Sequence, residues 1–204
     1  MHMTEKLKSN PSSIKQAANY LKNGKVIAFP TETVYGLGAL LSCPQAMGEI
    51  FHIKNRPANK PLMAHISSLE MLSFLDILPP ELLQPLVGAF LPGPLAIILP
   101  RGDGSTLGIR MPSHPVALAL IEAVGEPIMA TSANLSGQPS LASPEEILEA
   151  LGGKIAAVLD GGPASSGTPS TILSLASERP TLLRSGPISQ AMLEEVLGLP
   201  ILCA

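Results

Sequence analysis

KVIAFP (Lys25–Pro30), followed at once by the polar residues TET (Thr31–Thr33), is the stretch that decides the fold. It is a continuous apolar run of strand length, which is typical of a buried strand that leads into a loop. Similar runs recur along the chain, at residues 61–66, 95–99, 107–109, 127–130, 155–159, 171–175 and 181–183.

Helical patterns separate many of these runs. The first begins at Asn10-Pro11 and ends at Gly24, because Pro favours the first turn of a helix and Gly favours its end. The others cover residues 44–53, 69–75, 81–90, 116–124, 145–151 and 189–197. Short strands that alternate with helices predict an α/β fold. The link from Leu99 to Leu107 is too short for a helical crossover, so we expect a mixed sheet.

The composition limits what the chain can be. Its 204 residues fit one domain, residues 1–204, and 13 Lys+Arg against 16 Asp+Glu disfavour a protein that wraps nucleic-acid phosphates nonspecifically. Pro and Gly interrupt the uncharged stretch Leu82–Pro100, and Met1–Lys8 has no apolar core, so we expect neither a membrane span nor a signal peptide. Cys43 and Cys203 are far apart, and no metal-spaced His/Cys set occurs. We expect a cytoplasmic protein with reduced thiols and no metal site.

Polar residues stand where the predicted strands end. They are Thr31, Thr33, His65, Arg110, Ser132, Asn134 and Arg184. In an open α/β sheet, ligands collect in the crevice beyond strand ends, so these side chains are expected to converge. The alternative is that they are ordinary turn and cap residues.

The segment Lys54–Pro61 places three cations within seven residues, and its two prolines prevent a regular helix from spreading them apart. They are suited to one anion, such as a polyphosphate, although a solvated charged loop is the common alternative. The loop Ser132–Gly137 offers hydroxyl, amide and backbone N–H groups to oxygen ligands, or closes on itself as a turn. Since no GxxxxGK[ST], complete GxGxxG, HExxH or GxSxG motif is present, a nucleotide site here needs another design.

These segments together resemble the YrdC-like threonylcarbamoyl-adenylate synthases in their short, single-domain bacterial form, from about residue 12 to residue 197. The motifs that carry the resemblance are FPTETVYGLG (29–38), IKNRPANKPL (53–62), LPGPL (91–95), IRMPSHP (109–115), TSANLSGQPS (131–140), PSTIL (169–173) and LLRSGPI (182–188).

The resemblance implies a twisted open sheet with flanking helices and a large concave basic cavity. It also implies an enzyme, a nucleotidyltransferase that joins L-threonine, bicarbonate and ATP, with Mg²⁺, into threonylcarbamoyl-AMP and pyrophosphate for the t6A modification at position 37 of ANN-decoding tRNAs. The expected partners are the downstream t6A-transfer enzymes, with tRNA itself bound weakly if at all and no membrane contact.

The resemblance also assigns roles to residues. Its KxR and SxN motifs match the proposed catalytic set Lys54, Arg56, Ser132 and Asn134. Its ATP contacts fall on Arg56, Lys60, Thr106, Ser132, Ser140 and Arg184, and its threonine contacts on Thr33, His65, Arg110, Ala130 and Ser170. In this reading Lys54 holds the triphosphate together with the ATP-binding cations. Asn55 and Ala96 depart from the glycine and threonine that are common at these positions in the family.

Two alternatives stay open at this stage. The first is an RNA-binding module whose basic concavity holds a nucleic-acid backbone without catalysis, although 3% aromatic residues offer little for base stacking. The second is a paralogous adenylating or carbamoyl-transfer enzyme on the same scaffold that uses another amine substrate.

Overall fold

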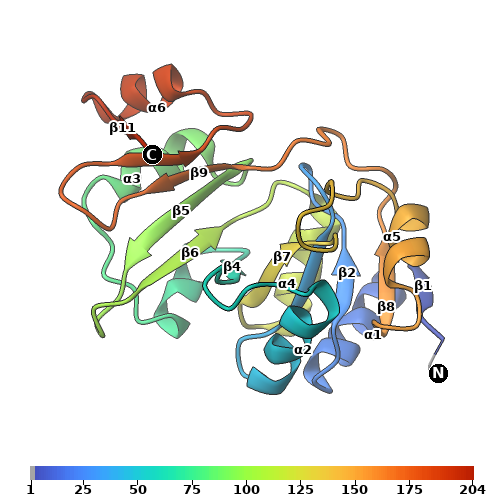
Figure 1. Ribbon diagram of the computed structural model, residues 1–204. Helices are drawn as coiled ribbons and strands as arrows, with labels where there is room; N and C mark the ends of the chain where they lie inside the picture. The colour runs from blue at the N-terminus through green and yellow to red at the C-terminus, as the bar shows by residue number, and fades with distance from the viewer. Residues whose placement is uncertain (1–2) are drawn as a thin grey trace.

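A mixed β-sheet runs through the computed structural model, which describes residues 3–204 (Figure 1). Its strands are β1 Glu5–Lys8, β2 Ile27–Phe29, β3 Gly36–Leu40, β4 Met63–His65, β5 Leu95–Pro100, β6 Thr106–Arg110, β7 Ile128–Ser132, β8 Ala157–Asp160, β9 Thr171–Ser174, β10 Thr181–Arg184 and β11 Leu202–Cys203. The helices are α1 Pro11–Lys22, α2 Pro44–Lys54, α3 Leu83–Phe90, α4 Pro115–Val124, α5 Pro144–Leu151 and α6 Gln190–Leu197, with a 3₁₀ helix at Leu69–Phe74.

The strands are ordered β1-β8-β2-β3-β7-β4-β6-β5-β9-β10-β11, so the sheet is open, with β1 and β11 at its edges. The sheet contains parallel pairs, such as β4 with β6, and antiparallel pairs, such as β5 with β6. The mixed α/β sheet expected from the sequence is therefore confirmed. The single-domain boundary at residues 1–204 stays a prediction.

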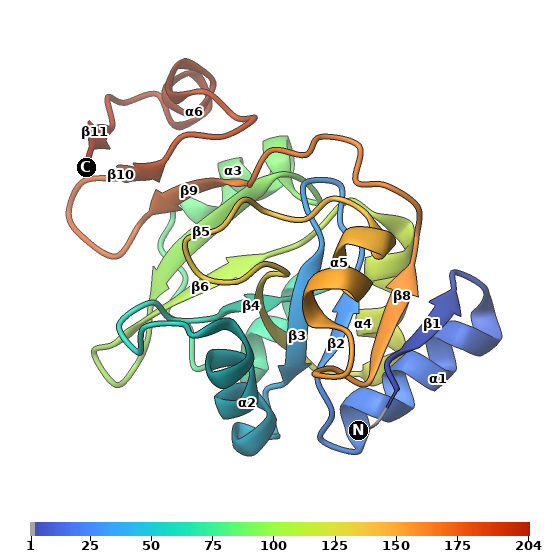
Figure 2. The same cartoon turned by 45° about the vertical axis from the view of Figure 1, so that its right-hand side comes forward.

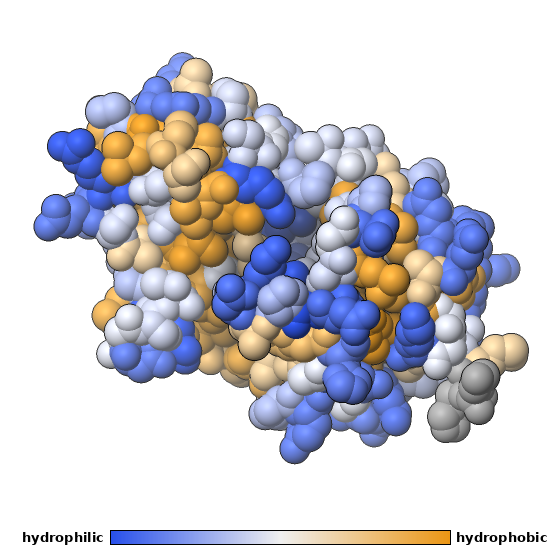
Figure 3. Space-filling view, viewed as in Figure 1, coloured by the Kyte–Doolittle hydropathy of each residue, from blue (hydrophilic) through white to orange (hydrophobic). Residues whose placement is uncertain are grey.

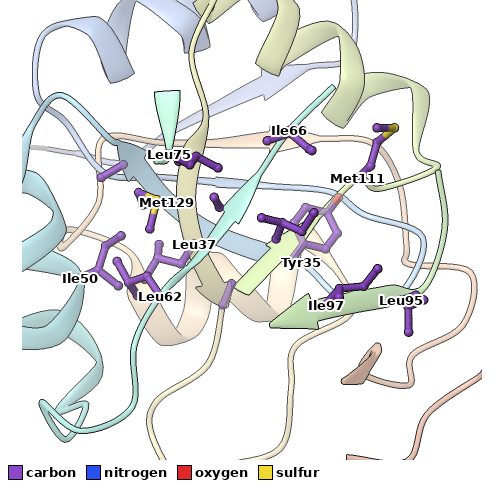
Figure 4. Close-up of a cluster of buried hydrophobic side chains, with 14 of the residues drawn as sticks. Tyr35, Leu37, Ile50, Leu62, Ile66, Leu75, Leu95, Ile97, Met111 and Met129 are labelled. Atoms are coloured by element: carbon purple, nitrogen blue, oxygen red, sulfur yellow. The ribbon is translucent and has the colours of Figure 1, made fainter. Parts of the chain in front are cut away.

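Helices cover the sheet and enclose two apolar cores (Figures 1 and 2). Helices α1 and α4 pack together against β2, β7 and β8, with Leu21 and Leu120 fully buried between them. The second core joins α2, α3, α5 and α6, and Figure 4 shows its centre around Tyr35 and Leu37. No helix among residues 3–204 combines the length and the apolarity that crossing a bilayer requires.

Local chemistry sets the ends of several helices. Asn10 caps α1 by accepting a hydrogen bond from the Ser13 N–H at 2.9 Å, and Ser143 with Glu146 forms a capping box on α5. Helix α2 ends at Asn55, which has φ 49° in the left-handed region. Asn tolerates this conformation better than most residues, and glycine tolerates it freely. Asn55 therefore suits the left-handed turn at the end of α2, a conformation that glycine, the common residue here in the family that the motifs resemble, also adopts readily.

Three strands, β1, β3 and β11, were not expected from the sequence. Strand β3 (GLGAL) is buried along its whole length and lies between β2 and β7. A Cβ on Gly36 would lie 2.8 Å from Cζ of Phe29, and one on Gly38 would lie 2.6 Å from Cγ2 of Ile128. Glycine usually weakens a strand, but here it admits the packed Phe29 ring, so tertiary packing overrides the local preference.

We expect Gly38→Ala to destabilise the protein by about 1–3 kcal/mol, because the added methyl group enters a packed core next to the β-branched Ile128. Urea unfolding measures this difference. Gly48→Ala is the matched control, since Gly48 is exposed within α2 with open space around its Cα, and it should be neutral or stabilising by up to about 1 kcal/mol. Equal effects of the two substitutions would contradict the packing argument.

Candidate functional site

Strand register places the site's side chains on one face of the sheet. His65 on β4 lies opposite Arg110 on β6, Met63 lies opposite Ala130 on β7, and Gly36 on β3 lies opposite Ser132. Residues that are paired across neighbouring strands point to the same face, and so do residues two apart along a strand. Segments far apart in the sequence therefore present their side chains to a common space.

A pocket of about 290 Å³ occupies this space. It is lined by Thr31, Val34, Tyr35, Gly36, Arg56, Lys60, Pro61, Met63, His65, Arg110, Ala130, Thr131, Ser132, Ser140, Pro169, Ser170, Ile172 and Arg184. Figure 3 shows a hollow near the middle of one face of the molecule, with hydrophilic residues at its border.

Four cations line this pocket: Arg56, Lys60, Arg110 and Arg184. No Asp or Glu is among the lining residues of the described chain. The pocket therefore carries an excess of positive charge although the whole protein has a net charge of −3. Such a local excess attracts anions and suits phosphate or carboxylate ligands.

Main-chain carbonyls hold two of these cations in place. Arg56 donates from Nε to Lys60 O at 2.6 Å and from Nη2 to Pro61 O at 2.9 Å. Arg184 donates from Nε and Nη2 to Ser170 O at 2.9 and 2.8 Å. Burial lowers the pKa of both guanidinium groups. A carbonyl is uncharged, so each bond fixes the side chain and leaves its positive charge available to a ligand.

Arg110 has a different environment, with its side chain only 6% exposed. Its Nη2 donates to Thr33 Oγ1 at 2.6 Å and lies 2.9 Å from Glu32 Oε1. Burial lowers the pKa of Arg110, and the nearby Glu32 carboxylate acts in the opposite direction. Thr31, which lines the pocket, donates to Val34 O at 2.6 Å and lies 2.9 Å from Thr33 Oγ1.

The hydrogens of this network can be assigned from its geometry. Thr31 uses its hydroxyl hydrogen on Val34 O, so in its contact with Thr33 it acts as the acceptor. Thr33 therefore donates to Thr31 and accepts from Arg110. Its hydroxyl can offer a ligand only a lone pair, which suits an ammonium, amine or hydroxyl hydrogen.

His65 is buried in the pocket wall and packs edge-to-face on Phe29, with ring centroids 5.7 Å apart. Burial, together with the positive charge of Arg110, lowers its pKa from 6.5 to about 3. Its Nδ1 lies 3.3 Å from Met63 O. The imidazole is thus neutral at physiological pH and adds no further positive charge to the pocket.

Lys54 lies beneath the SxN loop and is 1% exposed. Its ammonium group donates to the main-chain carbonyls of Ser132 and Asn134, and burial with repulsion from Arg56 lowers its pKa to about 8. Asn134 in turn donates to Leu135 O at 2.9 Å, and it accepts from the Ser132 hydroxyl at 2.5 Å. The lysine therefore braces this loop from below.

The pocket gathers most of the residues predicted from the sequence. Those in its lining are Arg56, Lys60, His65, Arg110, Ala130, Ser132, Ser140, Ser170 and Arg184. Thr33 is fully buried and contacts Arg110, Asn134 is a buried residue of the SxN loop itself, and Lys54 is buried against the main chain of that loop. The expectation that Lys54 holds the triphosphate directly does not fit this placement, because its ammonium is occupied by carbonyl oxygens.

Thr106 lies apart from the other predicted ligands. It begins β6, is exposed, and stands four residues before Arg110 on the same strand. At the rise of a strand this separates the two residues by roughly 13 Å. Thr106 is outside the pocket lining, so its contact with ATP stays a prediction.

Sequence reasoning missed two residues of the site, Glu32 and Tyr35. Tyr35 lines the pocket, and its hydroxyl donates to Gly162 O at 2.7 Å and accepts from the Gly161 N–H at 3.1 Å. Burial raises its pKa to about 12. Both residues belong to the quoted FPTETVYGLG stretch. Glu32 could have been found there, because it is the one carboxylate next to polar residues that were expected to lie beside several cations.

The described chain offers no obvious resident metal site. Among residues 3–204, no group of three or more His, Cys, Asp or Glu side chains is placed to hold a metal ion. The pocket lining presents hydroxyl, guanidinium and ammonium groups instead.

An open mixed sheet with a basic pocket on one face defines an α/β protein suited to small anionic ligands. The sequence matches the Sua5/YciO/YrdC family, described as telomere recombination, over residues 19–186. This chain belongs to that family, and the resemblance found in its motifs is confirmed.

Curated relatives carry related names. Threonylcarbamoyl-AMP synthase of Bacillus subtilis (strain 168) is 44% identical over 206 residues, which cover 96% of this chain and 60% of that protein. Threonylcarbamoyl-AMP synthase of Vibrio parahaemolyticus is 36% identical over 172 residues, which cover 78% of this chain and 92% of that protein. The chain thus spans 60% of the length of the first relative.

Solved structures have the same fold. The Pyrococcus abyssi Sua5 structure complexed with L-threonine has a TM-score of 0.92 at 39% identity and covers 98% of this chain and 62% of its own. Escherichia coli YciO has a TM-score of 0.81 at 28% identity, with coverage of 92% and 97%. The open sheet with flanking helices is shared by both.

We expect His65 to make the protein sensitive to acid. Below pH 6.5 the unfolded chain binds a proton at this residue, whereas the folded protein does not until the pH reaches about 3. Stability from this residue is therefore lost as the pH falls through this window, by about 2 kcal/mol between pH 6.5 and 5. Urea unfolding at both pH values should show a smaller loss for His65→Gln, and equal losses would contradict the buried neutral state.

The bracing role of Lys54 predicts a stability effect. Lys54→Met should lower the free energy of unfolding by roughly 2 kcal/mol, since two main-chain carbonyls lose a charged donor, and hydrogen exchange should quicken over residues 132–138. The matched control Lys60→Met removes an exposed cation of the pocket, and it should change stability by no more than about 0.5 kcal/mol. If Lys54→Met were as stable as Lys60→Met, the bracing role would be wrong.

Proposed function

We propose that this chain carries threonylcarbamoyl-AMP synthase activity and forms threonylcarbamoyl-AMP, pyrophosphate and water from L-threonine, bicarbonate and ATP. The observation that carries the proposal is the pocket lined by four cations and no carboxylate in a protein of negative net charge. The names of the relatives and the L-threonine in the Pyrococcus abyssi structure support it.

The substrates of this reaction repel one another. The threonine carboxylate, bicarbonate and the ATP phosphates are all anions, and two unit charges 4 Å apart repel by about 4 kcal/mol at an effective dielectric of 20. Arg56, Lys60, Arg110 and Arg184 would offset this repulsion in one pocket. Because the carbonyls around Arg56 and Arg184 already fix these side chains, little reorganisation is needed when the substrates bind.

The proposed roles follow the position of each group. Arg110 and Ser170 hold the threonine carboxylate, and the neutral ring of His65 orients its amine and hydroxyl. Thr33 is fully buried and fixes Arg110 from the protein side, which revises the direct contact expected for it. The amine nitrogen attacks carbon dioxide or bicarbonate, and in either case one bicarbonate oxygen leaves as water with protons from the amine. The resulting carbamate oxygen attacks the α-phosphorus of ATP while pyrophosphate leaves. This in-line displacement depends on positioning and charge, and it needs no covalent intermediate with the enzyme.

The triphosphate is assigned to the remaining cations. Arg56, Lys60 and Arg184 hold its oxygens, with Ser132 and Ser140 on the adjacent loop. Lys54 and Asn134 act by keeping this loop in shape, which revises the direct role expected for Lys54. Mg²⁺ enters as part of the Mg-ATP substrate, since no lining residue of the described chain supplies a carboxylate ligand.

The product is a reactive mixed anhydride, and its consumer is a transferase that moves the threonylcarbamoyl group to tRNA. We place the activity in the cytoplasm, where Mg-ATP and tRNA are available, with the t6A-transfer enzymes as downstream partners and tRNA itself bound weakly at most. The four cations line one pocket of about 290 Å³ and do not form an extended basic groove of the kind that follows a nucleic-acid backbone.

Arg56→Ala should lower pyrophosphate formation by roughly 100-fold or more, because a fixed cation at the developing phosphate charge is lost. The assay follows pyrophosphate released from Mg-ATP with L-threonine and bicarbonate, and omission of either co-substrate should abolish the signal. Arg179→Ala is the control, since Arg179 is exposed and outside the pocket lining. Full activity of Arg56→Ala would remove this residue from the site.

Mass spectrometry of the product tests the reaction itself. Threonylcarbamoyl-AMP made by the wild-type protein supports the proposal. An adduct formed only with another amino acid would favour the paralogous enzyme. RNA affinity that falls steeply with salt, without any pyrophosphate, would favour the RNA-binding module.

A further inference from the structure

Glu32 is a buried carboxylate beside a pocket that otherwise gathers positive charge. Its side chain is 15% exposed, both carboxylate oxygens are buried, and Oε2 has no hydrogen-bond partner among residues 3–204. Its Oε1 lies 2.9 Å from Arg110 Nη2, so the two side chains form a buried salt bridge. Burying a carboxylate is costly unless the opposite charge is this close.

The lining cations differ in the groups that hold their side chains. Arg110 is paired with the Glu32 carboxylate, whereas Arg56 and Arg184 are held by main-chain carbonyls. No salt bridge within the described residues 3–204 involves Arg56, Lys60 or Arg184. Arg110 thus keeps its charge but has a carboxylate beside it, whereas the other three cations have no carboxylate partner within the described residues.

Arg110 still has donors for a ligand. Its Nη1 makes no hydrogen bond within residues 3–204 and the residue lines the pocket, whereas its Nε is unpartnered but buried. A carboxylate can therefore bind to the guanidinium while Glu32 remains in place. The pair Arg110–Glu32 has no net charge, but it presents a positive guanidinium next to a negative carboxylate.

We propose that Glu32 makes the Arg110 subsite selective for a zwitterion, a ligand with one carboxylate and one ammonium or amine group, over a ligand with net negative charge. A free amino acid places its carboxylate on Arg110 and its amine on the side of the pair where the Glu32 carboxylate lies. A simple carboxylate or a phosphate meets the repulsion of Glu32 without the compensating attraction.

This inference rests on the proposed function and deepens it, because it explains how one basic pocket binds the amino acid and the triphosphate at different positions. The phosphates bind to Arg56, Lys60 and Arg184, which have no carboxylate partner within residues 3–204. The amino acid binds to Arg110, whose charge is balanced by Glu32. Glu32 is not among the lining residues, so it acts as a positioning and selectivity residue through Arg110 and does not touch the ligand.

The test compares two ligands that differ in the amine alone, L-threonine and 3-hydroxybutyrate, which is the same carbon chain without the amino group and carries one net negative charge. Calorimetric titration of the wild-type protein should show threonine binding at least about tenfold tighter. In Glu32→Gln the affinity for threonine should fall by about tenfold or more and that for 3-hydroxybutyrate should rise, so that the preference disappears.

Two further variants separate selectivity from folding. Glu32→Asp keeps the charge and should keep the preference for threonine even if both affinities decrease. Glu122→Gln removes an exposed carboxylate on α4 and should behave as the wild type. A parallel loss of both affinities in Glu32→Gln, or an unchanged ratio between them, would overturn the selectivity role. A wild-type protein that binds no threonine would instead contradict the proposed function and, with it, this inference.

Discussion

Strand pleat and register are the constraint on which the site depends. Successive side chains of a strand alternate between the two faces, so a shift of one residue moves every side chain to the opposite face. His65 and Arg110 are paired across β4 and β6, and both belong to the pocket because these strands are held in that register. The buried cores on both sides of the sheet fix the register, since a shift would move each side chain from the core it fits into the other one, where its size and shape do not match its neighbours.

The basic residues of the pocket also differ in their electrostatic surroundings. His65 is kept neutral by burial, Arg110 is balanced by Glu32, and Arg56 is fixed by uncharged carbonyls. The surroundings of each basic residue therefore decide how much positive charge it presents to a ligand. In the proposed function, these differences assign the polyphosphate and the amino acid to different parts of the pocket.

Much of the architecture followed from local pattern. The run at Lys25–Pro30 became β2, and the helix that begins after Asn10 became α1, because apolar periodicity and end residues act within a few positions. Strand β3 was missed, since Gly36 and Gly38 have low strand preference and are favoured here only by the Phe29 ring against them. Arg56 and Ser132 were placed at the site through the family resemblance, and the structure brings them to one pocket.

The sequence by itself determined the α/β class, the mixed sheet, the chemistry of the polar strand ends and the family. Only the tertiary structure decided that Lys54 supports the SxN loop from below, that Thr106 lies outside the pocket, and that Glu32 is paired with Arg110. The physical reason is range. Patterning and capping act between neighbours in the chain, whereas burial, charge pairing and hydrogen-bond direction depend on which distant segments the folded sheet brings together.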